Sequence, residues 1–155
     1  MRTLRWWSFG ALLLVLAVLG TVGWIGSERA LHPGYQHYDW SLDTFPDLHP
    51  EHIHVRGADN VLLDGLFFPG DRPSLVILAS GYGDTQVQMF SIAEFLHHAG
   101  FSVLTYNSRA RAKSGGQYVT LGAFEQQDVV SVVNYAIGRS DIISQCQPTR
   151  MTLST

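Results

Sequence analysis

The stretch LVILASGYGDT, residues 75–85, decides the fold that this sequence predicts. Its first part, Leu75–Ala79, is a continuous apolar run, as in a parallel-sheet strand that is covered on both faces. Ser80–Gly83 follows as a glycine-rich turn, and Asp84 or Thr85 is the residue type that caps a helix. The stretch therefore predicts a buried strand that turns sharply into a helix.

The residues that follow repeat this strand-and-helix pattern. Apolar residues at helical spacing predict a helix over Met89–Ala99, and Gly100 is suited to end it. Phe101–Tyr106 reads as a second buried strand, and apolar spacing predicts a second helix from Val129 to near Gly138. This alternation is typical of an α/β fold, so we expect a mostly parallel sheet in which Leu75–Ala79 and Phe101–Tyr106 pair side by side.

A hairpin is predicted before the first buried strand. Apolar and polar residues alternate around Ile53 and Val55 and again over Val61–Phe67, and Gly57–Asn60 between them is a turn. Farther along the chain, Arg150–Leu153 has the composition of a further strand.

The N-terminal stretch Trp6–Gly26 carries no charge, and Arg2 and Arg5 precede it. At ~1.5 Å per residue, a helix of this length roughly matches a ~30 Å hydrocarbon core. The basic residues favour a cytoplasmic N-terminus. A cleaved signal peptide and a buried core helix are the alternatives, but the run is long and no clean Ala-x-Ala follows it, which favours an uncleaved anchor.

Composition bounds the remaining possibilities. The chain has 155 residues, a net charge of -3 and one cysteine, Cys146. The mild charge argues against a nucleic-acid partner, and a single cysteine excludes an internal disulfide. His52 and His54 share a strand face, but no third metal ligand is evident, so no metal and no cofactor are expected. We predict residues 1–5 in the cytoplasm, a membrane helix at 6–26, a linker at 27–50 and a partial α/β domain at 51–155.

Five local patterns occur in order along the chain: Asp64–Leu66, Phe68–Gly70, Ser80–Gly83, Tyr106–Arg109 with Ser114–Gly116, and Glu125 with Asp128. Through these patterns, the chain between Ile53 and Arg139 resembles the α/β-hydrolase superfamily, and its anchor resembles that of the membrane-tethered members. The resemblance implies the N-terminal half of an α/β-hydrolase fold, with a hairpin followed by parallel strands and helical crossovers.

The resemblance also implies a site. Ser80, Gly81 and Gly83 would form the oxyanion loop, and the backbone N–H of Tyr82 would be one oxyanion donor. The alternative is that these residues form a tight strand-to-helix turn that needs glycine only for its backbone angles.

Several family residues are replaced. Ser80 stands where the family has His, Asn107 where it has Asp, and Ala110 and Ala112 where it has glycines. Gly-x-Ser-x-Gly occurs nowhere, although Arg150–Leu153 looks like the approach to it. The nucleophile, acid and histidine of a serine hydrolase therefore have no assigned position.

The other polar residues receive simpler interpretations. His97 and His98 are expected at the end of a helix, where its dipole favours them. Arg109, Arg111 and Lys113 are expected to form a solvated loop rather than an anion site. Cys146 lacks a partner and is expected to be inert.

Three functional hypotheses follow. Full-length relatives would hydrolyse a small-molecule ester, amide or thioester with a serine nucleophile, whereas this chain, ending before the elbow, is expected to be inactive alone. The alternative is a non-catalytic, membrane-tethered binding module whose exposed sheet edge is covered by a protein partner. A third hypothesis makes Ser80 a nucleophile, but Leu78 is too large for the crowded elbow position.

Overall fold

The computed structural model describes residues 2–34 and 36–139, and these belong to two compact units, 1–34 and 35–155. The first unit is one helix, α1 (Arg2–Leu31), which begins before and ends after the predicted segment Trp6–Gly26. Within α1, the part Gly10–Leu31 contains an 18-residue window with a mean hydropathy of 2.0. By length and composition it is able to cross a membrane, and a signal sequence would meet the same criteria.

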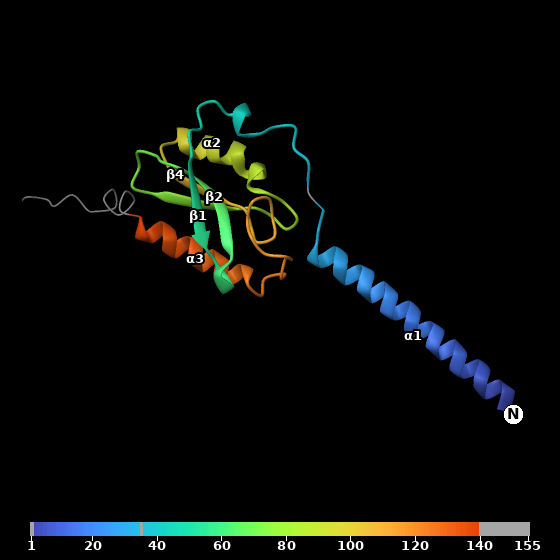
Figure 1. The fold of residues 1–155 in the computed structure, drawn as a ribbon. Coiled ribbons are helices and arrows are strands. Elements are labelled where there is room, and N and C mark those ends of the chain that lie inside the picture. The colour runs from blue at the N-terminus through green and yellow to red at the C-terminus, as the bar shows by residue number, and fades with distance from the viewer. Residues whose placement is uncertain (1, 35, 140–155) are drawn as a thin grey trace, which may run out of the picture. The chain divides into compact units, whose positions relative to one another are not determined.

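The described part of the second unit, residues 36–139, is built on a four-stranded mixed sheet (Figure 1). Its strands lie in the order β1 (Glu51–Arg56), β2 (Leu62–Phe68), β4 (Ser102–Tyr106) and β3 (Leu75–Ala79). β3 and β4 are parallel, which confirms their predicted pairing, and the predicted hairpin is the antiparallel pair β1–β2. The prediction of a mostly parallel sheet is wrong for these strands, because β2 is antiparallel to both β1 and β4.

Two helices cover opposite faces of this sheet, α2 (Phe90–His98) on one and α3 (Glu125–Gly138) on the other (Figure 1). Side chains of a strand alternate between faces, so β2 and β4 contribute to both cores. On the α3 side the buried residues are Ile53, Val55, Leu63, Phe67, Leu104, Tyr106, Val132 and Ala136. On the α2 side they are Leu48, Leu66, Phe68, Phe90, Ala93 and Val103.

The two parallel strands differ in burial. Every residue of β4 is buried, as the apolar pattern predicts. β3 was expected to be equally covered, but its first four residues are only half-buried and Ala79 is exposed. The reason is position: in the described part of the chain β3 pairs with β4 alone and forms an edge of the sheet.

The stretch between α1 and β1 contributes to the domain core. Leu48 is buried there, and Leu42 and Phe45 pack against the same cluster. The ring of Phe45 meets that of Phe90 edge-on, with 6.1 Å between centroids. The range 27–50, expected as a loosely packed linker, thus begins as the last turns of α1 and ends as part of the core beneath α2.

The predicted helix signals have different outcomes. Gly100 follows α2 with φ +87°, a left-handed conformation that glycine adopts easily, and this confirms the predicted stop. A short 3-10 helix, η3 (Gln86–Met89), precedes α2. Thr85, one of the two predicted cap residues, occupies the N-cap position of η3 but makes no side-chain capping hydrogen bond.

Candidate active site

The turn after β3 has the geometry that its glycines predict. The N–H of Asp84 donates to the carbonyl of Gly81 at 3.1 Å, which closes a four-residue turn. Gly83, the third residue, has φ +76°, as the third position of a type II turn requires. Tyr82, the second residue, is 60% exposed, so the turn presents it to solvent.

A pocket of about 490 Å³ lies beside this turn. It is formed where β3 and β4 end, together with the loop that leads into α3. In open α/β sheets this edge, beyond the carboxyl ends of parallel strands, is where ligands bind. The lining residues share this location: Ala79, Ser80, Gly81, Tyr82, Gly83, Tyr106, Ser108, Arg111, Val119, Leu121, Gly122, Glu125 and Val129.

Ser80 meets Ser108 in this pocket, with 3.5 Å between their Oγ atoms. A serine nucleophile needs an adjacent base that accepts its proton. In the described part of the chain the hydroxyl of Ser80 is not hydrogen-bonded to a histidine or a carboxylate. The geometry therefore gives no support to Ser80 as a nucleophile.

A buried polar network lies beneath the turn. The carboxylate of Asp64 accepts the amide Nδ2 of Asn107 at 3.0 Å and the Nε2 of Gln86 at 3.3 Å. Asn107 in turn accepts the backbone N–H of Gln86 through its Oδ1, at 2.8 Å. An aspartate at position 107 would lose the donor to Asp64 and place two carboxylates together, so the amide is matched to this neighbour.

Two hydroxyl groups complete the network. Thr105 donates to the Oε1 of Gln86 at 2.9 Å. Ser114 donates to the carbonyl of Asn107 at 2.7 Å and accepts the N–H of Asp64 at 2.9 Å. The network thus connects three segments, namely the residues after β3, the end of β4 and the loop that follows β4. The network is not predicted from the sequence, although Asp64 and Thr105, polar residues at buried strand positions, are a signal for it.

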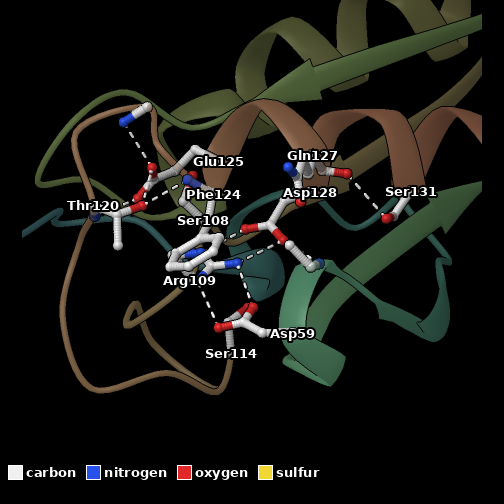
Figure 2. Close-up of polar contacts among 12 residues, drawn as sticks. Asp59, Ser108, Arg109, Ser114, Thr120, Phe124, Glu125, Gln127, Asp128 and Ser131 are labelled. Atoms are coloured by element: carbon white, nitrogen blue, oxygen red, sulfur yellow. Dashed lines mark hydrogen bonds and ion pairs between the residues drawn. The ribbon is translucent and has the colours of Figure 1, made fainter.

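Arg109 forms a second buried cluster, which Figure 2 shows at the start of α3. Its Nε and Nη2 donate to Asp128 at 2.8 and 2.9 Å, and Nη2 also donates to Asp59 at 3.1 Å. The guanidinium carbon lies 4.7 Å from the ring centroid of Phe124. The hydrogen bonds with Asp128 outweigh burial and, with those to Asp59, raise the pKa of Arg109 above its usual range.

This cluster corrects one prediction. Arg109 and Arg111 were expected in a solvated loop, but each is 3% exposed, and only Lys113 of the three lies at the surface. The two alanines that flank Arg111 have positive φ, +55° at Ala110 and +46° at Ala112. The loop therefore keeps the left-handed backbone that the family's glycines would supply, now with side chains that disfavour it.

Glu125 organises the loop that forms one wall of the pocket (Figure 2). Its carboxylate accepts the N–H and the hydroxyl of Thr120, at 2.6 and 2.5 Å, and the N–H of Gly122 at 2.7 Å. Burial alone would raise the pKa of Glu125, but the hydrogen bonds from Thr120, Gly122 and its own backbone lower it overall.

The predicted histidines lie away from the pocket lining. His97 and His98 form the last turn of α2, as predicted, and the Nε2 of His98 is 3.6 Å from a carboxylate oxygen of Asp47. His54 lies on β1 with its Nε2 3.8 Å from the Oδ1 of Asp64. Among the described residues no group of three His, Cys, Asp or Glu is arranged to hold a metal ion. Cys146 and Arg150–Leu153 lie outside the described residues.

Comparisons with known proteins agree with this architecture. No family model and no curated protein matches the chain. Among solved structures, the Pyrococcus furiosus esterase Pf2001 is 26% identical in one crystal form, with a TM-score of 0.63 over 73% of this chain and 44% of the esterase. In a second crystal form the identity is 27% and the TM-score is 0.62, over 72% of this chain and 44% of the esterase. PA2218 of Pseudomonas aeruginosa, 18% identical with a TM-score of 0.51 over 61% of this chain and 32% of its own, shares the fold.

Over the part of its length that these structures cover, the chain is related in structure to the α/β-hydrolase superfamily. The motif at Ser80–Gly83 lies on the turn after β3, and the motif at Tyr106–Arg109 begins at the last residue of β4. The chain spans less than half the length of the esterase that it matches.

Proposed function

We propose that this chain is a serine-hydrolase-like protein in which the Ser80–Gly83 turn supplies the oxyanion-binding side of the site. The backbone N–H of Tyr82 is the proposed donor, and the substrate is a small ester, amide or thioester. The observation that carries the proposal is the pocket that this turn borders, at the carboxyl ends of β3 and β4. One such donor, aimed at the developing oxyanion, contributes about 2.7–4 kcal/mol to catalysis.

We also propose that this chain does not catalyse hydrolysis by itself. Its sequence has no Gly-x-Ser-x-Gly, and Ser80 has no base in the described part of the chain. The nucleophile, base and acid of a serine hydrolase act as one unit, so a donor alone gives only residual effects. The full chain in detergent micelles should therefore neither hydrolyse a nitrophenyl ester nor react with a fluorophosphonate. Turnover and labelling that are both abolished by Ser80→Ala would contradict this expectation.

A ligand titration tests the donor directly. Phenylacetate carries the carboxylate of an ester product, and in the full chain it should shift the amide resonance of Tyr82, whereas neutral phenylethanol should not. Tyr82→Pro removes the N–H, and proline suits the second position of a type II turn, so this variant should lose the carboxylate preference. Tyr82→Ala, which keeps the N–H, is the matched control. Equal binding by the two variants would contradict the proposed donor.

A second candidate is a non-catalytic, membrane-tethered module that binds another protein chain. It is favoured by the uncharged edge strand β3 and by apolar side chains that α3 leaves exposed, among them Val130 at 57% and Ile137 at 63%. Unpaired edges and apolar faces of this kind are where partner chains bind. In this case Val130→Glu would reduce co-purification of a partner, and Tyr82→Pro would change nothing.

We also propose that Trp6–Gly26 is an uncleaved anchor, with residues 1–5 in the cytoplasm and the linker and domain outside it. The uncharged run and the preceding Arg2 and Arg5 support this orientation. A reporter that works only in the cytoplasm, fused after Arg139, should be inactive. Reporter activity would reverse the topology.

A further inference from the structure

We propose that Tyr38 is a positioning residue for the Ser80–Gly83 turn, which it holds through the carboxylate of Asp84. The inference rests on the proposed role of this turn. It adds a residue from the stretch before β1, far from the pocket in sequence, to the machinery that fixes the oxyanion donor.

The connection between Tyr38 and the turn is short. The hydroxyl of Tyr38 donates to the Oδ2 of Asp84, whose other oxygen accepts the N–H of Thr85 at 2.8 Å. Asp84 is 5% exposed, and its own N–H closes the turn on Gly81. One side-chain hydrogen bond thus links Tyr38 to the residue that ends the turn.

Tyr38 is itself supported by its neighbours. Its ring centroid lies 5.0 Å from that of Trp40, and the indole Nε1 of Trp40 donates to the carbonyl of Val87 at 3.4 Å. A few residues later, Phe45 packs edge-on against Phe90. The hydroxyl is therefore presented by a segment that packs on η3 and α2, the elements that directly follow the turn.

The hydrogen bond from Tyr38 also fixes the position of the negative charge on Asp84. A carboxylate beside an oxyanion-binding turn would oppose a developing negative charge, since like charges repel. Both oxygens of Asp84 are engaged by Tyr38 and Thr85, and the pocket lining in the described part does not include Asp84. Tyr38 therefore fixes the turn and keeps this carboxylate in place at the same time.

Tyr38→Phe tests the proposal in the full chain in detergent micelles, by amide hydrogen exchange. Loss of one side-chain hydrogen bond should speed exchange within the turn by about three- to tenfold, while β4 and α3 exchange as before. Tyr118→Phe is the matched control, because Tyr118 is 46% exposed and its hydroxyl has no hydrogen bond in the described part of the chain. It should leave exchange unchanged throughout.

Variants at Asp84 distinguish positioning from general stabilisation. Asp84→Asn keeps an oxygen that accepts the N–H of Thr85 and gains an amide N–H that donates to the hydroxyl oxygen of Tyr38, so it should preserve most of the protection of the turn. Asp84→Ala should match or exceed the effect of Tyr38→Phe. Unchanged exchange in Tyr38→Phe, or equal acceleration in the turn and in β4, would overturn the proposal.

The phenylacetate titration separates this proposal from the proposed function. If both hold, Tyr38→Phe should weaken phenylacetate binding at least about threefold, measured under conditions in which the variant and the wild type are both fully folded. A turn that loosens in Tyr38→Phe, in a chain whose Tyr82 amide never responds to phenylacetate, would refute the oxyanion role and retain the positioning role. Phenylacetate binding that Tyr38→Phe leaves unaltered would refute the positioning role alone.

Discussion

Asp128→Asn should destabilise the domain more than any other single change of charge described above. Asp128 is 2% exposed, and its two oxygens accept the Nε and Nη2 of Arg109 and the backbone N–H of Ala58. The substitution keeps the shape of the side chain but leaves the buried guanidinium with Asp59, whose side chain is 47% exposed, as its remaining counter-charge. Removing one partner of a buried ion pair costs about 3–5 kcal/mol.

The size of this loss makes it easy to measure. Small domains are stable by about 5–15 kcal/mol, and asparagine retains one acceptor, so we expect a loss near 3 kcal/mol. Urea unfolding of the full chain in micelles, followed by fluorescence, measures it. Asp59→Asn is the control, since an exposed partner contributes about 0–1 kcal/mol. Equal losses in the two variants would refute the reasoning that the buried half of the cluster carries the stability.

Three further predictions concern the turn and the loops. Gly83→Ala should lower the free energy of unfolding by about 1 kcal/mol in the same urea assay, because φ at Gly83 is +76°. Gly81→Ala is the control: its added Cβ would meet only an ordinary contact at 3.6 Å, so the free energy of unfolding should change by less than about 0.5 kcal/mol. Ala110→Gly should raise the thermal midpoint, because φ is +55° there; an unchanged or lower midpoint would contradict stored strain. Glu125 has a lowered pKa, so its stabilisation is present above its unfolded value near 4.5 and is lost as pH falls through the folded value. Glu125→Gln should therefore be less stable than the wild type at pH 7, and this difference in the free energy of unfolding should shrink as pH falls below 4.5. A difference that stays constant between pH 7 and pH 3 would exclude the linkage.

Local sequence patterns were sufficient to predict the main helices and strands and the parallel pairing of β3 with β4. The apolar run at Leu75–Ala79 and the helical spacing after it specify a strand and a crossover, and such a crossover brings the next strand alongside in parallel. Gly100 marks the end of α2 because the helix stop depends on a single left-handed residue. The turn at Ser80–Gly83 is predicted from its glycines in the same way, because a left-handed backbone angle favours glycine.

Long-range partners were not visible in the sequence. The position of β2 between β1 and β4 depends on contacts between segments that no local period encodes, so the antiparallel pairing of β2 with β4 was not predicted. Arg109 was predicted to be solvated because its partner Asp59 lies 50 positions earlier in the chain, beyond the reach of any local pattern. Basic residues are usually exposed, and that expectation fails where two carboxylates converge on one side chain.

The order of the strands has a consequence for synthesis of the chain. β1 and β2 are neighbours in the chain, so the hairpin is able to form as soon as both have left the ribosome. β3 is made next, but its only partner in the described sheet is β4, which follows after the whole of α2. During that interval Leu75–Ala79 is an uncharged strand without its partner on a nascent chain, so it is exposed to chaperones and to premature pairing with other chains.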